Sequence, residues 1–372
     1  MRRLETLVTL IAFLFYGWFF WHFGTAGVLR YLELAWWGLI VTVCLDAFLL
    51  MASTAGWRAT IIPYPNPLSF KQLFAARIAG EAIDYITPAA QLGGSLVCAM
   101  MIRNKLSLPR GLASTAIASL SQALSQLLFI VAALILSARQ LPPSSGLRWL
   151  IGGGLVVTAG LTIGFYVVQV KRPFSHLWSA AVRLNIAQLK ADSVREGARE
   201  ADASLAYFYS HEWARLARSC FCFLAGACLG PFEIYFLFSL LNQHVTFHTA
   251  LLIEALAQLA DRVMFMVPGK LVTREGGKAL IVSVLGYSPQ VGFVVGLLRH
   301  AKEMIWVLAG LLCLAVHRAS LGSTIRPAAA RAEYRLVAGY ATSRSSLKDT
   351  THTGEYGAPA GSQTRTRTKR KP

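Results

Sequence analysis

Charged side chains stand in two stretches of the chain that are surrounded by long apolar runs. The first stretch runs from Arg77 to Gly94 and reads RIAGEAIDYITPAAQLGG. Its Glu81, Asp84 and Pro88 follow one another at spacings of three and four residues, so a helix would place them on one face. Pro88 has no backbone N–H to donate and is expected to break that helix.

The second stretch, from Glu254 to Gly277, repeats the same ingredients. Glu254, Gln258 and Asp261 again share one face of a helix, and Pro268 is expected to interrupt it. Such groups can line a hydrated cavity that receives a polar or anionic head group. They can also form ion pairs that only hold the helices together, and the sequence leaves both interpretations open.

Burial in lipid makes these charges expensive, since one ionised side chain at the centre of a membrane helix costs roughly 2.5–3.5 kcal/mol. They are therefore expected to meet water, a ligand or one another, and Arg299 can pair with Glu303 one helical turn later. The residues expected to line a head-group path are Arg77, Glu81, Asp84, Gln91, Glu254, Gln258, Asp261, Arg262, Arg274, Glu275 and Arg299. The residues expected to shape the two breaks and permit sharp reversals are Pro88, Gly93, Gly94, Pro268, Gly269, Gly276 and Gly277.

Composition places the whole chain in a membrane. Of its 372 residues 55% are hydrophobic and only 15% charged, whereas soluble domains carry about a quarter charged residues. The apolar runs predict an all-α protein with about six transmembrane helices, over residues 4–23, 32–53, 111–136, 147–170, 213–241 and 289–316. Two broken or re-entrant segments, 71–102 and 249–287, complete a membrane domain over residues 1–318.

The distribution of basic residues predicts how the domain is oriented. Positive charge collects at the N-terminus, in residues 58–71, in the polar loop 171–212 and in the tail 319–372. All of these should lie in the cytoplasm, together with both termini, in a multi-pass protein of the cell (inner) membrane. The unit of helix, broken segment and helix then occurs twice with opposite orientation, which is the inverted repeat typical of transporters.

The formal net charge of +18 is local rather than general. The tail is expected to be disordered and to contact anionic lipid head groups, while the loop 171–212 is expected to be helical and solvated. Nucleic-acid binding is the weaker interpretation of these charges, because no globular domain presents them. Polar residues along the helix over 111–136, namely Thr115, Ser119, Gln122 and Gln126, form a stripe that faces either protein or a cavity.

Signals of catalysis are weak throughout the sequence. No P-loop, GxSxG, HExxH or dinucleotide-binding fingerprint occurs. His244 and His248 are four residues apart but have no third ligand nearby, so a metal site is not expected. We therefore expect neither an enzyme nor a cofactor.

Three motifs resemble a known family. GEAIDYITPAAQLGG, PGKLVTREGG and LLRHAKEMIWVLAGL are similar to the flippase-like membrane domain of lysylphosphatidylglycerol synthases, with the strongest resemblance to its hopanoid-biosynthesis-associated branch. Glu233 within GPFEIYFLF also resembles that branch. The chain departs from the family pattern at Ser95, where an acid usually follows the glycine pair, and at Val272, where a glycine usually stands. The similarity covers roughly residues 1–318, and no soluble stretch is long enough for the synthases' aminoacyl-transferase domain. The resemblance therefore implies lipid translocation without lipid synthesis.

Together these features predict a protein that translocates a polar or anionic lipid between leaflets, or assists that step. The resemblance adds hopanoid-related and aminoacylated lipids as candidates. The first alternative is a scaffold that does not transport but recruits lipid-biosynthetic enzymes through its tail and the loop 171–212. The second alternative is a membrane-embedded glycolipid transferase.

Overall fold

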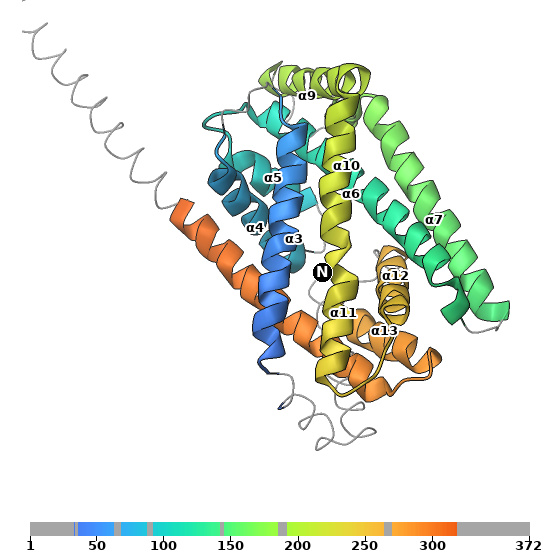
Figure 1. Cartoon of the computed structure of the whole chain (residues 1–372). Coiled ribbons are helices and arrows are strands. Elements are labelled where there is room, and N and C mark those ends of the chain that lie inside the picture. Colours follow the sequence, from blue (N-terminus) through green and yellow to red (C-terminus); the bar gives the residue numbers. More distant parts are fainter. Residues whose placement is uncertain are drawn as a thin grey trace, which may run out of the picture. The chain divides into compact units, whose positions relative to one another are not determined.

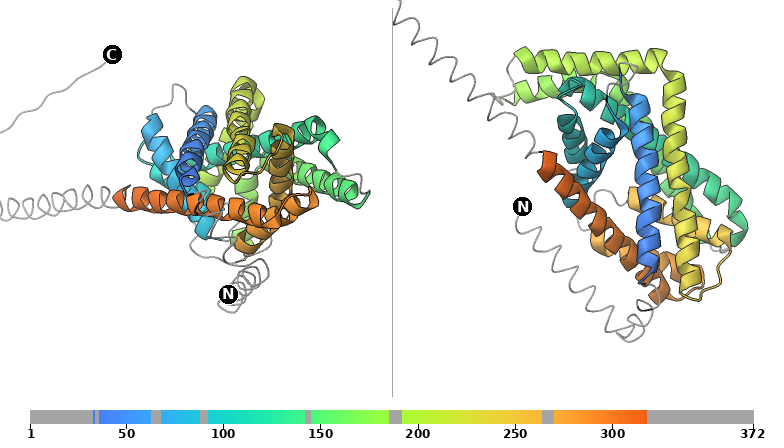
Figure 2. Two further views of the ribbon diagram at one scale, coloured as in Figure 1. Left: turned by 60° about the horizontal axis from the view of Figure 1, so that its bottom comes forward. Right: turned by 60° about the vertical axis from the view of Figure 1, so that its left-hand side comes forward.

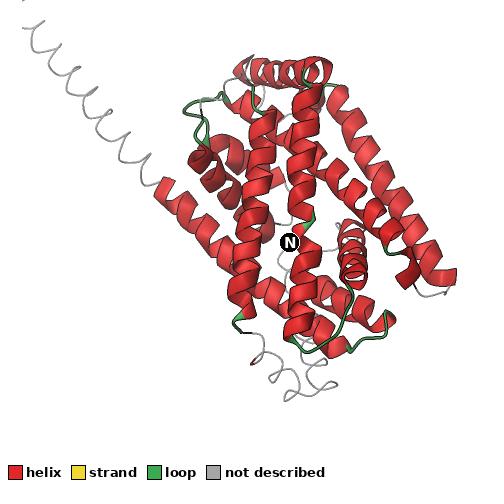
Figure 3. Cartoon of the chain, viewed as in Figure 1, coloured by secondary structure: helices red, strands yellow, loops and turns green. Residues whose placement is uncertain are grey.

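The structure of the protein is a computed structural model that describes residues 33, 36–62, 68–87, 92–141, 145–184, 192–263 and 270–317. Regular structure in these ranges is entirely helical (Figure 3). In hydrocarbon a helix satisfies the backbone polar groups within one segment, so apolar sequence of this length folds as helices. The predicted helical class is confirmed.

Four helical stretches are long and apolar enough to cross a membrane: Gly38–Thr60, Leu108–Leu136, Gly146–Val170 and Trp213–Leu240. They comprise α3 (Gly38–Thr60), α6 (Leu108–Leu136), most of α7 (Ser145–Val170), and α10 (Trp213–Ala227) together with α11 (Leu229–Leu240). The predicted helix over 289–316 corresponds to a helix over residues 289–317. The predicted first helix, over 4–23, lies outside the described residues.

Two predicted helix boundaries were wrong. The helix predicted over 32–53 continues to Thr60, because no proline or charge pattern ends it earlier. At its end the backbone amide of Ile61 donates to the carbonyl of Arg58. The helix placed at 213–241 is divided at Cys228 into α10 and α11. Pro231 lacks the N–H that would bond to the carbonyl of Ala227, where α10 ends.

Each charged stretch forms a pair of helices. The first comprises α4 (Phe70–Ile86) and α5 (Leu92–Met101), and the second comprises α12 (Phe247–Val263) and α13 (Lys270–Val284). The members of each pair pack against each other. The expected breaks at Pro88, Pro268 and Gly269 lie outside the described residues.

The glycine pairs do not form the expected reversals. Gly93 and Gly94 lie inside α5, and Gly276 and Gly277 lie inside α13. Gly94 is needed for close packing instead, since a Cβ at this position would lie 2.3 Å from the carbonyl oxygen of Gly80 on α4. Around Gly277 there is open space.

The polar loop 171–212 contains α8 (Pro173–Arg183) and α9 (Asp192–His211), and α9 lies across the end of α10 in Figure 1. The helical character of the loop 171–212 was predicted, but the loop also packs against the helix bundle and is not fully solvated. Phe208 is fully buried, and the buried Asp202 carboxylate accepts hydrogen bonds from the amides of Phe174 and Ser175 at the start of α8. The Tyr209 hydroxyl donates to Gln169 of α7, and burial raises the pKa of Tyr209, which keeps the donor neutral.

Two of the hydrophobic clusters define two groups of helices, and a third joins α6 of one group to α12 of the other. One cluster combines α11, α12, α13 and the helix over 289–317, and another combines α3, α4, α5 and α6 with Phe223 of α10. Helix α3 packs against α10, and the two lie side by side in Figures 1 and 2. The helix over 289–317 also connects the two groups, since its Gly310 crosses the backbone of α4.

We expect Gly310→Ala to destabilise the protein by about 1–3 kcal/mol through overpacking. The new Cβ would lie 2.4 Å from the carbonyl oxygen of Ile78 and 2.7 Å from Cβ of Ala82. The measurement is the apparent melting temperature of the purified protein in detergent. Gly160→Ala is the matched control, because that helical glycine faces open space. Equal melting temperatures for the two variants would contradict the close crossing of α4.

Candidate functional site

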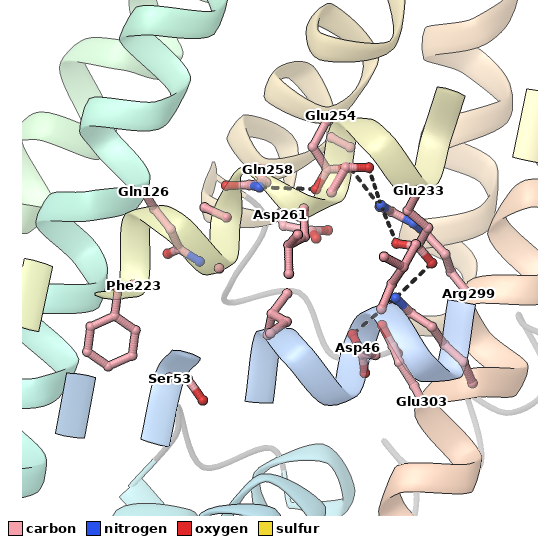
Figure 4. Close-up of a pocket in the computed structure, with 18 of the residues that line it drawn as sticks. Asp46, Ser53, Gln126, Phe223, Glu233, Glu254, Gln258, Asp261, Arg299 and Glu303 are labelled. Carbon is pink, nitrogen blue, oxygen red and sulfur yellow. Dashed lines mark hydrogen bonds and ion pairs between the residues drawn. The ribbon is translucent and has the colours of Figure 1, made fainter. Parts of the chain in front are cut away.

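A cavity of about 230 Å³ lies where the two helix groups meet. Its walls are formed by α3, α4, α6, α10, α11, α12, α13 and the helix over 289–317, and much of its lining is charged (Figure 4). A polar cavity among apolar helices is the kind of site in which a membrane protein handles polar substrates or ions.

Arg299 is the centre of the ion pairs in one wall. Its Nη2 lies 2.8 Å from Oε2 of Glu233 on α11, and its Nη1 lies 2.7 Å from Oε2 of Glu254 on α12. Nη2 also donates to the carbonyl of Gly230 at 3.3 Å. The sequence suggested only Glu303, on the same helix, as a partner, whereas the structure shows two partners on other helices.

Lys302, one helical turn further on, extends the same cluster. Its Nζ lies 2.8 Å from Oε1 of Glu233 and 3.1 Å from Oδ1 of Asp46 on α3. Two cations of one helix therefore hold three carboxylates from α3, α11 and α12 (Figure 4). A charged partner leaves such a buried cluster only at high cost, because its counter-ion would stay desolvated and unpaired.

A second charged group lines the wall formed by α4 and α6. The Nε of Arg77 lies 2.9 Å from Oε1 of Glu81, and its Nη2 donates to Gln122 Oε1 at 3.2 Å. Gln122 and Gln126 both line the cavity, as one of the two interpretations of the polar stripe predicted. Thr115, in the same stripe, donates to the carbonyl of Leu112 of its own helix.

Carboxylates outnumber cations in the described lining. The carboxylates are Asp46, Glu81, Glu233, Glu254, Asp261 and Glu303. The cations are Arg77, Lys278, Arg299 and Lys302. With every group ionised, the six negative charges exceed the four positive charges by two.

The structure brings six of the predicted site residues together at the cavity: Arg77, Glu81, Glu254, Gln258, Asp261 and Arg299. The side chains of Arg274 and Glu275, and all of Gln91, lie outside the part of the chain that the structure describes. Arg262 follows Asp261 but does not line the cavity.

Asp84 is not among the residues that line this cavity, and its place in a head-group path stays a prediction. Its Oδ1 accepts a hydrogen bond from the backbone amide of Gly94 at 2.7 Å, within the first turn of α5. The first amides of a helix have no partner inside the helix, and a carboxylate there satisfies one of them. Asp84 therefore connects α4 to the start of α5.

The prediction missed five charged lining residues: Asp46, Glu233, Lys278, Lys302 and Glu303. Each is a charged residue within or beside an apolar run. The free-energy cost of a charge in lipid was the signal that could have identified these residues. The sequence could not show that these side chains meet in one cavity, because they come from four helices that are distant along the chain. No group of three or more His, Cys, Asp or Glu side chains suited to a metal ion occurs among the described residues.

The fold and the cavity define a helical membrane protein with a charged site between its helices. Residues 6–310 match the family described as the lysylphosphatidylglycerol synthase TM region, and the chain belongs to this family. The resemblance to that family is thereby confirmed, while its hopanoid-associated branch stays a prediction. No curated protein and no solved structure matches the chain.

We expect Arg299→Gln to destabilise the protein by about 3–5 kcal/mol, because it leaves Glu233 and Glu254 buried without their shared cation. Arg110→Gln is the matched control. Arg110 pairs with Glu200 at 2.8 Å on an exposed surface, where an ion pair contributes about 0–1 kcal/mol. Apparent melting temperatures in detergent compare the two variants, and similar losses would contradict the central role of Arg299.

Proposed function

We propose that the protein moves a lipid between the leaflets of the cell membrane by passing the polar head group through the charged cavity. The acyl chains remain in the bilayer during this step. The observation that carries the proposal is the charged cavity itself, which lies within a bundle of apolar helices and is lined by ten ionisable side chains. No covalent step belongs to the proposal.

The physical barrier to lipid movement is the desolvation of the head group. A polar or charged group in hydrocarbon loses its hydrogen bonds to water, at a cost of several kcal/mol for each unsatisfied group. The lining of the cavity offers carboxylates, cations and amides in place of that water. The ion pairs of Arg299 and Lys302 hold these groups in position, so they need not reorganise around the head group.

The paired helices support a transport mechanism over the alternatives. Charged lining residues come from α4 in the first pair and from α12 and α13 in the second. In the proposed topology the two segments form an inverted repeat that enters from opposite sides, with both termini in the cytoplasm. A scaffold that recruits lipid-biosynthetic enzymes, or that binds anionic lipid through its basic tail, has no need for a cavity of this kind.

Substrates of this proposed transport are lipids with a polar head group, with hopanoid-related and aminoacylated lipids as candidates. The family of the chain supports a role in lipid metabolism of the membrane. Glu81 and Asp261 are the acidic lining residues that retain most access. Glu81 keeps 42% of its side chain exposed, and Asp261 is also exposed. They are the groups that an incoming head group would meet first.

The transport test uses purified protein in liposomes of phosphatidylcholine and phosphatidylglycerol that carry a tail-labelled fluorescent phosphatidylglycerol. Dithionite bleaches only the outer leaflet, so loss of fluorescence beyond that fraction measures translocation. We expect wild-type protein to give such a loss and Asp261→Asn to slow it roughly tenfold, the effect of losing a charged hydrogen bond.

Asp192→Asn is the matched control, because Asp192 is exposed on α9 and does not line the cavity. It should translocate lipid at the wild-type rate. If Asp261→Asn folds normally and also keeps the wild-type rate, the cavity is not the path of the head group.

A further inference from the structure

Helix α8 carries an exposed apolar stripe, formed by Leu177, Ala180 and Leu184, far from the residues of the charged cavity. Leu177 is 67% exposed, and Leu184, which follows the last residue of the helix, is 76% exposed. The two leucines are seven residues apart, which is two helical turns, so they lie on one face. Large apolar side chains on one face of a short helix indicate that this face has a partner.

Contacts with α9 fix which side of α8 points outward. Phe174 packs against a buried cluster to which α9 contributes, and Arg195 of α9 lies over the ring of Trp178, 5.5 Å from its centroid. The Asp202 carboxylate of α9 accepts hydrogen bonds from the first amides of α8. Phe174 and Trp178 are one turn apart and lie on a different side of the helix from the apolar stripe. The stripe therefore faces away from the protein.

Basic residues flank the apolar stripe at both ends. Lys171 and Arg172 precede α8, Arg183 lies in its last turn, and all three are exposed. No Asp or Glu occurs anywhere in residues 171–184. The outward side of α8 therefore combines apolar surface with positive charge alone, and its partner should be apolar and anionic.

The exposed face of α9 provides a comparison within the same polar loop. It mixes the acids Asp192 and Glu196 with the bases Arg195 and Arg199, and it has no exposed leucine, isoleucine or valine. Figure 1 shows α9 lying across the end of α10, and α8 packs against α9. The two helices share one end of the bundle, but the exposed face of α9 suits water, whereas that of α8 does not.

Charge and position together select the partner of the apolar stripe. The tail 319–372 is itself strongly basic, and a second copy of the chain would bring the same cations, so both would be repelled. By contrast, α8 begins three residues after α7 ends at Val170, and α7 is long and apolar enough to cross a membrane. The surface of the bilayer is therefore within reach. There acyl chains lie just beneath anionic phosphates, which matches leucines flanked by cations.

We propose that α8 lies flat on an anionic lipid leaflet at the end of α7. Leu177 and Leu184 enter the layer of head groups, while Lys171, Arg172 and Arg183 contact lipid phosphates. The lipid is bound here as a surface and not as a transported substrate, so the inference does not depend on the charged cavity. It makes the order of α8 sensitive to the content of anionic lipid in the membrane.

The test measures hydrogen exchange by mass spectrometry on the full-length protein in nanodiscs. One preparation contains phosphatidylcholine alone, and the other contains equal parts of phosphatidylcholine and phosphatidylglycerol. We expect the amides of residues 173–184 to exchange at least about tenfold more slowly with phosphatidylglycerol, because opening of α8 must then also break its contacts with the lipid phosphates. Peptides from α6 should exchange equally in both lipids. High salt should reduce the difference at α8.

A charge variant tests the cations. Lys171→Gln combined with Arg183→Gln should reduce the effect of phosphatidylglycerol on α8 to about threefold or less, since one of three cations remains. Arg103→Gln combined with Arg199→Gln is the matched control. It removes the same charge from exposed positions outside α8 and should keep the wild-type difference.

An apolar variant tests the leucines. Leu177→Ser combined with Leu184→Ser should speed the exchange of α8 in both lipid mixtures, because contact with the acyl chains is lost whatever the head group. Unchanged exchange of α6 shows that the variants are folded.

Three results would overturn the proposal. The first is equal exchange of wild-type α8 in the two lipid mixtures. The second is a charge variant that responds to phosphatidylglycerol as strongly as its matched control. The third is that soluble polyglutamate, added to phosphatidylcholine nanodiscs, slows the exchange of α8 as much as phosphatidylglycerol does, which would make the surface one for an acidic protein.

Discussion

The ion pairs of Arg299 and Lys302 are the interaction on which the arrangement of helices depends. Between helices that face lipid, apolar contacts provide little driving force, because acyl chains are as apolar as leucine. Charged contacts therefore have a large share in deciding which helices meet. One helix supplies both cations, and they reach carboxylates on α3, α11 and α12. These bonds connect the early part of the chain to its late part through groups that cannot be left unpaired without a large cost.

Close backbone contacts make that cluster possible. A Cβ at Gly230 would lie 2.6 Å from Oε1 of Glu254, so only glycine lets Glu254 approach α11 closely enough to share Arg299 with Glu233. The same glycine supplies a carbonyl acceptor to Arg299. Gly310 plays a corresponding role further along the helix over 289–317, where it allows contact with the backbone of α4. Small residues and charges thus act together, the first by permitting approach and the second by stabilising it.

The sequence predicted the membrane class, most of the long helices and six of the lining residues, because all of these follow from hydropathy, helical spacing and the cost of charge in lipid. It did not predict the role of Asp84, since the same acidic side chain on a helical face can line a cavity or satisfy the first amides of a neighbouring helix. It also missed Lys302 and Asp46 as partners, because they are 256 positions apart and a single sequence carries no signal for such a contact. Periodicity describes one helix at a time, whereas this site is formed by several.

The sequence left two interpretations of the charged residues open. They could form ion pairs that stabilise the bundle, or they could line a cavity that receives a polar group. The structure contains the ion pairs and also a charged cavity, and the paired residues line that cavity. Arg299 and Lys302 each pair with two carboxylates, although Nε of Arg299 is buried without a hydrogen-bond partner among the described residues. Oε1 of Gln126 and Oε1 of Gln258 also line the cavity and retain hydrogen-bonding capacity that no described residue uses. Groups that only stabilise a fold are selected to be satisfied, while unsatisfied groups beside them reduce stability unless a ligand completes them. A wall of ion pairs next to amide oxygens that lack partners is therefore consistent with the proposed passage of a head group.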